Sequence, residues 1–270
     1  MALVYNVGML DILTGPVAFA LLIVLIYMTF WFILSLIFER NDIADIAWGL
    51  GFITVAWAFR GKYDPPVASN FTLILVLTTL WGLRLATHIF SRNVGKAEDY
   101  RYKAWRDEWG KWFFLRSYLQ VFLLQGLFMV LISFSAAVAV FGPSRVGFFG
   151  VIGTLLWILG FVFESLGDWQ LRKFIKNPHN KGKIMKDGLW KYTRHPNYFG
   201  EVAQWWGIFL ITFSSPYFLL AAVSPLVITY LLLKVSGIPM LEKKYEDNAE
   251  FQEYKKVTNA FFPWFPKKSG

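Results

Sequence analysis

Long runs of apolar residues, separated by polar segments, dominate this chain of 270 residues. A helix that spans a bilayer needs roughly 20 mostly apolar residues, and seven runs approach that length. They lie at about 16–38, 44–59, 68–90, 113–140, 146–167, 198–213 and 216–235. The pattern therefore predicts an all-α integral membrane protein with seven transmembrane helices.

The second and sixth runs are the shortest, which predicts a broken or tilted span at either place. No basic segment precedes the first run, and no small-residue cleavage site follows it. We therefore expect the first run to stay in the protein as a span instead of being removed as a signal peptide.

Composition agrees with a membrane location. Hydrophobic residues make up 56% of the chain and charged residues only 17%, with a mean hydropathy of +0.44. Soluble domains carry about one quarter charged residues, so a secreted domain and a DNA-binding domain are both excluded. The chain has no cysteine, which excludes disulfides, a thiolate nucleophile and a cysteine-based metal site.

Lys and Arg lie almost wholly on one side of the predicted topology. The segments before span one and after spans two, four and six hold only Arg60, Lys62 and Arg145, whereas the other exposed segments hold 21. Cytoplasmic loops of membrane proteins collect Lys and Arg. The count predicts an N-out, C-in orientation, and it explains the net charge of +9 without a nucleic-acid partner.

The longer cytoplasmic segments carry aromatic residues among their charges, which disordered segments lack. We expect these segments to fold as interfacial helices at the membrane surface. In the tail, residues 238–259 have the pattern of a single helix with Pro239 in its first turn.

Polar residues inside the apolar runs are costly in lipid, about 2.5 to 3.5 kcal/mol for a charge near the centre of a span. In this chain they fall in the predicted cytoplasmic half of four spans. They are Asp45 and Trp48, then Trp81, Arg84 and His88, then Glu164 and Asp168, then Asn197, Glu201, Gln204 and Trp205. Residues three or four apart share a helix face. The sequence therefore predicts a polar cavity that opens to the cytoplasm.

Each of these residues also has a simpler interpretation. Arg84 is near enough to its helix end to reach the interface by snorkelling, and an isolated histidine such as His88 is more often a packing residue. Asp45 fits a charge at a helix N-terminus, which the helix dipole stabilises. The three tryptophans, taken singly, are typical of aromatic belts or core packing. The cluster as a whole carries the functional interpretation.

The segment between the fifth and sixth spans concentrates candidate ligand contacts. Arg194 and His195 precede Pro196, a residue that favours the first position of a helix. A helix N-terminus beside cations suits a phosphate. Further cations in this segment are Arg172, Lys173 and Lys183. The alternative is that these cations serve topology alone. No G-x-G-x-x-G or P-loop motif occurs, and the histidine pattern predicts no metal site.

Four elements of the sequence resemble the steroid 5-alpha-reductase family, in particular its bacterial branch long known as a domain of unknown function. They are W-G-L-R-L from Trp81, E-D-Y-R-Y from Glu98, D-W-Q-L-R-x-F from Asp168 with R-H-P-N-Y-F-G-E from Arg194, and the closing F-P-W from Phe262. The resemblance covers about residues 20–266. The R-H-P-x-Y-x-G-E motif is shared with isoprenylcysteine carboxyl methyltransferases, which use S-adenosylmethionine, whereas the D-W-Q-L-R-x-F and E-D-Y-R-Y elements favour the reductases.

This resemblance implies an enzyme that binds NADPH between its last helices and the cytoplasmic loops. Asp168, Arg172, Asn197 and Glu201 match cofactor contacts of the family, and Arg92 with Asn93 matches an Asn-Arg pair in inverted order. The remaining cofactor-binding candidates are Tyr100, Arg101, Lys173, Lys183, Arg194, His195 and Tyr198.

The resemblance also implies reduction of the 4-ene of a 3-oxo steroid. Animal members pair a tyrosine on the third helix with a glutamate on the second; here Trp81 and Asp45 stand nearest those positions. An indole donates a hydrogen bond but is a poor proton source. The expected catalytic residues are Asp45, Trp81, Arg84, His88 and Tyr102, and the expected substrate contacts are Trp48, Trp81 and Trp205.

The hypothesis is thus a multi-pass membrane reductase of steroid or other lipid enones, with its active site facing the cytoplasm. Residues 1–270 form one domain, with substrate-side helices at about 16–90 and cofactor-side helices and loops at about 113–266. The enone arrives from the bilayer and NADPH from the cytoplasm. The alternatives are a methyltransferase of the isoprenylcysteine type and a non-catalytic sterol- or lipid-binding membrane protein.

Overall fold

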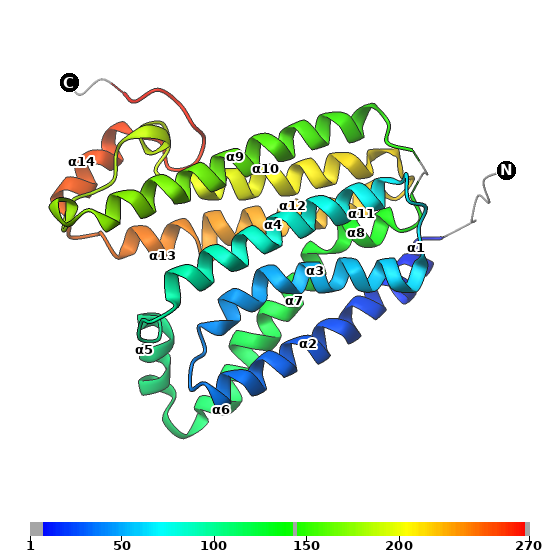
Figure 1. Ribbon diagram of the computed structural model, residues 1–270, viewed down its shortest axis with the longest axis horizontal. Coiled ribbons are helices and arrows are strands. Elements are labelled where there is room, and N and C mark those ends of the chain that lie inside the picture. Colours follow the sequence, from blue (N-terminus) through cyan, green and yellow to red (C-terminus); the bar gives the residue numbers. More distant parts are fainter. Residues whose placement is uncertain (1–7, 143–144, 268–270) are drawn as a thin grey trace. The chain divides into compact units, whose positions relative to one another are not determined.

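The computed structural model describes residues 8–142 and 145–267, and the regular elements in these ranges are all helical (Figure 1). The predicted all-α class is confirmed. Lys268, one of the 21 Lys and Arg residues on the predicted cytoplasmic side, lies outside the described residues. The α-helices are α1 (Met9–Ile12), α2 (Ala18–Ile37), α3 (Ile43–Tyr63), α4 (Asn70–Asn93), α5 (Tyr100–Trp109), α6 (Phe113–Arg116), α7 (Leu124–Ile132), α8 (Phe134–Ala139), α9 (Phe148–Lys176), α10 (Pro196–Ile211), α11 (Phe218–Ala221), α12 (Val223–Tyr230), α13 (Ile238–Lys243) and α14 (Ala249–Val257).

Six helical stretches among the described residues are long and apolar enough to cross a membrane. They are Met9–Ile37, Ile43–Tyr63, Asn70–Asn93, Tyr100–Ala139, Phe148–Lys176 and Phe218–Lys243. The predicted sixth span corresponds to α10, whose 16 residues are fewer than a spanning helix ordinarily needs. The multi-pass membrane class is supported, whereas the count of seven spans and the N-out, C-in orientation stay predictions.

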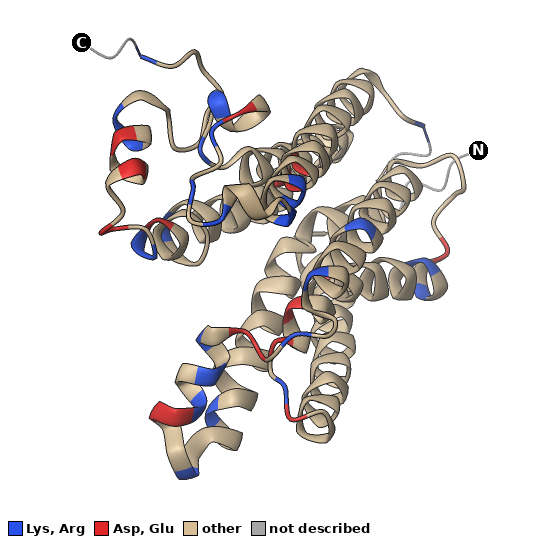
Figure 2. Ribbon diagram, turned by 60° about the vertical axis from the view of Figure 1, so that its left-hand side comes forward, with Lys and Arg blue, Asp and Glu red and all other residues tan. Residues whose placement is uncertain are grey.

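Charge is distributed unevenly among the helices (Figure 2). Lys, Arg, Asp and Glu gather on the short helices α5 and α14, whereas α2 carries none. Helix α9 continues to Lys176, about two turns beyond the predicted end, because no helix-breaking residue follows until Pro178. Its polar last turns therefore belong to the same rigid helix as its apolar span.

The prediction of a single tail helix over 238–259 is wrong. Helix α13 ends at Lys243, and α14 begins after Asn248. The Asn248 side chain accepts from the backbone N–H of Phe251 at 2.9 Å, which caps the new helix. Pro239 does lie in the first turn of α13, as expected. The break allows α13 and α14 to take different directions.

The chain folds as two compact units. The first contains Met1–Gly147 and Thr212–Ser224, and the second contains Phe148–Ile211 and Pro225–Gly270. Residues 113–147, which the sequence analysis assigned to the cofactor side, belong to the first unit. Each unit is described by itself below.

Close glycine contacts bring α3 and α4 together in the first unit. A Cβ on Gly49 would lie 2.8 Å from the carbonyl oxygen of Gly82, and a Cβ on Gly82 would lie 2.5 Å from that of Gly49. No larger residue fits at this crossing without displacing backbone. Small residues of this kind allow helix backbones in membranes to approach closely. The contact fixes the neighbouring residues Trp48 and Trp81 relative to one another.

Close glycine contacts also bring two helices together in the second unit, and there they extend over a longer distance. Helices α9 and α10 run side by side and antiparallel (Figure 1), with glycines spaced seven residues apart on both. A Cβ on Gly153 would lie 2.4 Å from the carbonyl oxygen of Gly207, and a Cβ on Gly160 would lie 2.5 Å from that of Gly200. A seven-residue repeat stays on one helix face. The polar residues beside these glycines are therefore buried between α9 and α10.

Candidate functional site

A carboxylate in the first turn of α3 binds two side chains from the start of α5. The Tyr102 hydroxyl donates to Asp45 Oδ1 at 2.7 Å, and the Arg101 guanidinium donates to Asp45 Oδ2 at 3.1 Å. Arg101 Nε also donates to Asp99 Oδ1 at 2.9 Å. We call these four residues the Asp45 cluster. Tyr102 is only 3% exposed, so its hydroxyl is held away from bulk water.

Local capping explains why α5 begins where it does. Asp99 is the N-cap of α5 and accepts from the backbone N–H of Arg101 at 3.0 Å. The Asp99 backbone N–H in turn donates to Asp42, the buried residue that precedes α3, at 3.2 Å. Glu98 accepts from the backbone N–H of Asn41 at 2.7 Å. The acidic residues of the E-D-Y-R-Y element thus fasten α5 to the start of α3.

Where α5 meets the start of α3, Asp99 and Arg40 are kept ionised by their hydrogen-bond partners. Burial raises the pKa of Asp99, but the hydrogen bonds and charge of Arg101 outweigh it and lower the pKa below its ordinary value. The hydrogen bond to Asp42 raises the pKa of Arg40 above its ordinary value. Asp99 and Arg40 are therefore both charged at neutral pH.

An aromatic chain leads away from Asp45 along α3 and across to α4. Trp48 lies one turn after Asp45, and its ring packs against Phe52 with centroids 5.1 Å apart. Phe52 packs against Trp81 of α4 at 5.4 Å. Offset edge contacts of this type bury large apolar surfaces. Trp48 and Trp81, both predicted substrate contacts, thus belong to one apolar surface next to the carboxylate.

In the second unit, an ion cluster that contains the buried residues Arg194 and His195 connects the loop before α10 to the C-terminal part of the chain. Glu242 Oε1 accepts from Arg194 Nε at 2.9 Å and lies 3.2 Å from His195 Nε2. Lys255 Nζ lies 2.8 Å from Glu242 Oε2. We call these four residues the Arg194 cluster. Arg194 also donates to the carbonyl oxygens of Lys255 and Thr258, so it fastens the segment after α14 to the start of α10.

His195 has one satisfied and one unsatisfied ring nitrogen. Burial lowers the pKa of His195 more than the hydrogen bond and charge of Glu242 raise it, so the imidazole is neutral at pH 7. A neutral ring that donates from Nε2 to Glu242 leaves Nδ1 as an acceptor. That Nδ1 is buried without a hydrogen-bond partner. Tyr198 stacks on the ring at 5.5 Å between centroids.

Two further polar pairs join α9 to α10. Asn197 Nδ2 donates to Asp168 Oδ1 at 3.2 Å, and Gln204 Nε2 donates to Glu164 Oε2 at 2.6 Å. The side-chain oxygens of both amides are buried without a hydrogen-bond partner. Buried polar atoms normally have partners. Together with His195 Nδ1, these atoms form a set of unused acceptors on one unit, which suits a ligand that carries N–H or O–H donors.

A family model described as "Protein of unknown function (DUF1295)" matches residues 31–258. The chain belongs to this family. A 3-oxo-5-alpha-steroid 4-dehydrogenase 1 of Bos taurus is 37% identical over 62 residues, covering 23% of this chain and 24% of the relative. The corresponding Rattus norvegicus protein is 28% identical over 114 residues, covering 42% and 40%.

A third relative is an uncharacterized protein of Schizosaccharomyces pombe, 27% identical over 169 residues, which cover 53% of this chain and 49% of the relative. The chain thus spans from about a quarter to about half of the length of these curated relatives. No solved structure matches it significantly. The matches support the steroid 5-alpha-reductase-like family that the sequence motifs indicate.

Several predicted site residues of this DUF1295 member come together within its first unit, and others lie apart. Asp45, Arg101 and Tyr102 share one hydrogen-bonded cluster. On α4, Arg84 and His88 are half-buried on the face of Trp81, as their spacing predicts. The remaining candidates are Arg92, which is exposed and donates to Asn93 Oδ1 at 3.1 Å, and Tyr100, which is exposed.

In the second unit, the predicted contacts divide into buried and exposed groups. Glu201 and Trp205 are buried on α10, in addition to the residues described above. The predicted phosphate-binding cations Arg172, Lys173 and Lys183 are all exposed, at the end of α9 and in the loop that follows. Arg194 has a different environment, since its guanidinium is engaged by Glu242 and backbone carbonyls.

Sequence reasoning missed Glu242, the centre of the Arg194 cluster. It follows an apolar run, and it lies among lysines in a segment that resembles an ordinary cytoplasmic tail. No spacing relates it to Arg194, from which it is 48 residues distant. Asp42 was missed for another reason: it sits in a short polar link beside Arg40 and looks like a solvated turn.

Proposed function

We propose that this protein is an NADPH-dependent reductase of the 4-ene of 3-oxo-4-ene steroids or similar lipid enones. The observation that carries the proposal is the Tyr102 hydroxyl held on Asp45 beside the apolar surface of Trp48, Phe52 and Trp81. Curated relatives named as 3-oxo-5-alpha-steroid 4-dehydrogenases support the same reaction class. Methyl transfer needs no such donor.

Enone reduction sets the role of that hydroxyl. A hydride added to the β carbon moves the electron pair of the double bond onto the carbonyl oxygen, which becomes an enolate. A hydrogen-bond donor near that oxygen lowers the barrier, and a proton is then taken up at the α carbon. In the proposed mechanism the Tyr102 hydroxyl turns its single proton from Asp45 to this oxygen when the substrate binds, and Arg101 keeps the carboxylate in place.

The polar atoms of the second unit fit a dinucleotide. NADPH, when bound, supplies the hydride. The unused acceptors on His195, Asn197 and Gln204 suit amide, amine and ribose hydroxyl donors. The exposed cations Arg172, Lys173 and Lys183 suit phosphates. Asp168 and Glu201 complete the proposed set, whereas we propose Arg194 as a positioning residue that holds the loop before α10.

A binding test separates the proposed reductase from two competing functions. The R-H-P-x-Y-x-G-E motif is equally compatible with a membrane methyltransferase, and the buried aromatic surface is compatible with lipid binding without chemistry. The purified protein in lipid nanodiscs should bind NADPH saturably, bind no S-adenosylmethionine, and oxidise NADPH when progesterone is added. Binding of S-adenosylmethionine without NADPH binding would overturn the proposal.

Variants separate catalysis from lipid binding. Arg172→Ala and Glu201→Ala should each weaken NADPH binding and abolish progesterone-dependent oxidation at fixed NADPH. Lys191→Ala is the matched control, because Lys191 is another exposed cation of the same segment that lies outside the proposed set. Unchanged turnover in both test variants would show that the cofactor residues are assigned wrongly.

A further inference from the structure

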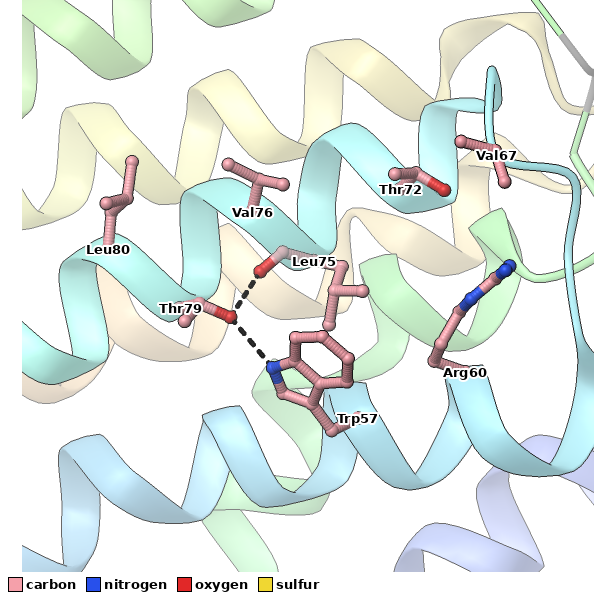
Figure 3. Close-up of a pocket in the computed structure, with 8 residues that line it drawn as sticks. All are labelled: Trp57, Arg60, Val67, Thr72, Leu75, Val76, Thr79 and Leu80. Carbon is pink, nitrogen blue, oxygen red and sulfur yellow. Dashed lines mark hydrogen bonds between the residues drawn. The ribbon is translucent and has the colours of Figure 1, made fainter.

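Two of the hollows in the described part of the chain differ in character. An apolar groove of α3 and α4 has a volume of about 300 Å³, and its central polar groups are paired, since Trp57 Nε1 donates to Thr79 Oγ1 at 3.2 Å (Figure 3). A polar hollow of about 520 Å³ lies in the second unit, at α13 and α14. It is lined by Pro239, Glu242, Lys243, Glu246, Gln252 and Lys255. Glu242 and Lys255 of the Arg194 cluster therefore border a hollow at the protein surface.

The two carboxylate oxygens of Glu242 have different partners. Oε2 lies 2.8 Å from Lys255 Nζ, and the Lys255 side chain is 47% exposed, so this ion pair lies on the side of the hollow. Oε1 lies 2.7 Å from Arg194 Nη2 and 3.2 Å from His195 Nε2, and both of these residues are buried. Glu242 therefore connects the hollow to a buried imidazole.

This carboxylate selects one tautomer of His195. An ionised carboxylate contains hydrogen-bond acceptors and no donor. Of the two neutral tautomers of the ring, only the one protonated at Nε2 can donate to Glu242 Oε1. The other tautomer would place the Nε2 lone pair 3.2 Å from a negatively charged oxygen. Glu242 therefore favours the proton on Nε2 and leaves the lone pair on Nδ1.

The orientation of the ring is fixed as well. Tyr198 stacks on it with the ring planes 12° apart. The His195 backbone N–H donates to Thr193 Oγ1 at 3.3 Å, and that hydroxyl donates to the carbonyl oxygen of Phe261 at 2.8 Å. His195 is only 4% exposed, and its Nδ1 has no hydrogen-bond partner. Because an unpaired buried acceptor costs free energy, an Nδ1 held in one tautomer and one orientation points to a ligand that carries a donor.

We propose that Glu242 is a positioning residue of the cofactor site, which fixes His195 in the Nε2–H tautomer so that Nδ1 accepts a hydrogen bond from an N–H or O–H group of the bound dinucleotide. The inference rests on the proposed function, because it takes NADPH as the ligand of the second unit. It adds a residue that lies outside the proposed cofactor set. A proton on Nδ1 would set a donor against the donor of the ligand and weaken binding.

NMR of the full chain in lipid nanodiscs, with nitrogen-15 and carbon-13 in histidine, reads the tautomer directly. The chain has three histidines, and His195→Gln identifies the signals of His195 by their loss. Correlation to the ring carbons separates the two ring nitrogens, and a protonated nitrogen differs in chemical shift from one with a lone pair. In the wild type Nε2 should carry the proton. Added NADPH should shift the Nδ1 signal and leave Nε2 protonated.

Variants of Glu242 test its role in selecting the tautomer. In Glu242→Leu, His195 should populate both tautomers, and the Kd for NADPH should rise about tenfold, equivalent to about 1.4 kcal/mol. Glu242→Gln should keep the wild-type tautomer, since its amide oxygen still accepts from Nε2. Lys255→Met is the matched control. It removes the ion pair on the side of the hollow and should change neither the tautomer nor the Kd.

Melting temperatures show whether each variant is folded. If Glu242→Leu is not, Glu242→Leu combined with Arg194→Met replaces it, because the pair leaves no buried charge unpaired, and Arg194→Met alone is then its control. An unchanged tautomer and Kd in the Leu variant would overturn the proposal, as would an Nδ1 signal that NADPH binding does not move. Failure of the wild type to bind NADPH would instead overturn the proposed function, and the ligand-free spectra would still decide whether Glu242 sets the tautomer.

Discussion

At the scale of single residues, paired side chains determine which groups can act. Asp45 has both carboxylate oxygens occupied, by Tyr102 and by Arg101. Glu242 similarly holds Arg194, His195 and Lys255. The first cluster presents a tyrosine hydroxyl beside an apolar surface. The second fixes the loop that precedes α10 and leaves a histidine acceptor unused.

Tyr102→Phe should lower kcat for progesterone reduction by about 10²-fold to 10³-fold, the usual loss when one oxyanion donor is removed. NADPH affinity should be unchanged, because Tyr102 lies outside the proposed cofactor set. Tyr118→Phe is the control, since the Tyr118 hydroxyl hydrogen-bonds to Thr29 Oγ1 at 2.9 Å and not to the Asp45 cluster. Steady-state kinetics and NADPH titration measure both quantities. Normal kcat in Tyr102→Phe would show that another group serves as donor.

His195 should make stability depend on pH. Its pKa is lowered in the folded protein, so the unfolded chain binds more protons once the pH falls below about 6.5, the ordinary histidine value. Stability should therefore be constant above that pH and fall through the window between 6.5 and the lowered folded pKa. His195→Gln should flatten this part of a melting-temperature profile.

His179→Gln is the matched control for that profile, because His179 is exposed in the turn after α9. Its profile should follow that of the wild type. Identical slopes in the His195→Gln and wild-type proteins would mean that another group, such as Glu242, controls the acid side of the stability curve.

At the scale of helices, close backbone contacts position the polar residues. The α9 and α10 glycines hold Glu164 next to Gln204, and the α3 and α4 glycines hold Trp48 near Trp81. The segment after α14 is fixed in another way. Trp264 donates its backbone N–H to the carbonyl oxygen of Tyr192 at 2.9 Å.

Gly160→Ala should destabilise the protein by about 1 to 3 kcal/mol, the usual cost of overpacking. The added Cβ would meet the carbonyl oxygen of Gly200 at 2.5 Å, and backbone cannot move aside as a flexible side chain does. Gly61→Ala is the control, because a Cβ added to this helical glycine would meet no atom within 4 Å outside the neighbouring backbone of its own helix. Melting temperatures in one detergent compare the two. Equal melting temperatures would show that the helices separate without cost.

The aromatic residues after α14 should enter the membrane interface. Phe262, Trp264 and Phe265 are 70%, 69% and 74% exposed, although large aromatics favour the headgroup region over water. Because the chain has no cysteine, a single spin label can replace Phe265. Its relaxation should respond more to lipid-soluble oxygen than to an aqueous nickel chelate. A label at His179 provides the exposed reference, and identical responses would exclude insertion.

At the scale of the whole molecule, the positions of the helices do not determine the membrane topology, which therefore stays a prediction. Six stretches meet the length of a span, and α10 is shorter. The lysine and arginine asymmetry still predicts N-out and C-in, which requires an odd number of crossings. Asp45 and Arg60, at opposite ends of α3, would then face opposite sides of the bilayer.

Single cysteines introduced at Arg145 and Lys181 test that topology. In intact cells a membrane-impermeant maleimide should label the cysteine at 145 and leave that at 181 unlabelled until the membrane is opened. The two positions flank α9, so they should lie on opposite sides if this helix spans. Reversed labelling would contradict the predicted orientation, and labelling of both positions in intact cells would contradict the spanning of α9.

The sequence alone determined the helical membrane class, most of the span positions and the family, because these depend on local hydrophobic runs and short motifs. It also placed Asp45 and Tyr102 among the candidate residues. Their hydrogen bond joins residues 57 positions apart, and the bond of Arg194 to Glu242 joins residues 48 apart. Such pairs depend on how helices cross. Only the tertiary structure determined these pairs, because no local sequence pattern indicates which distant side chain is the hydrogen-bond partner of a buried group.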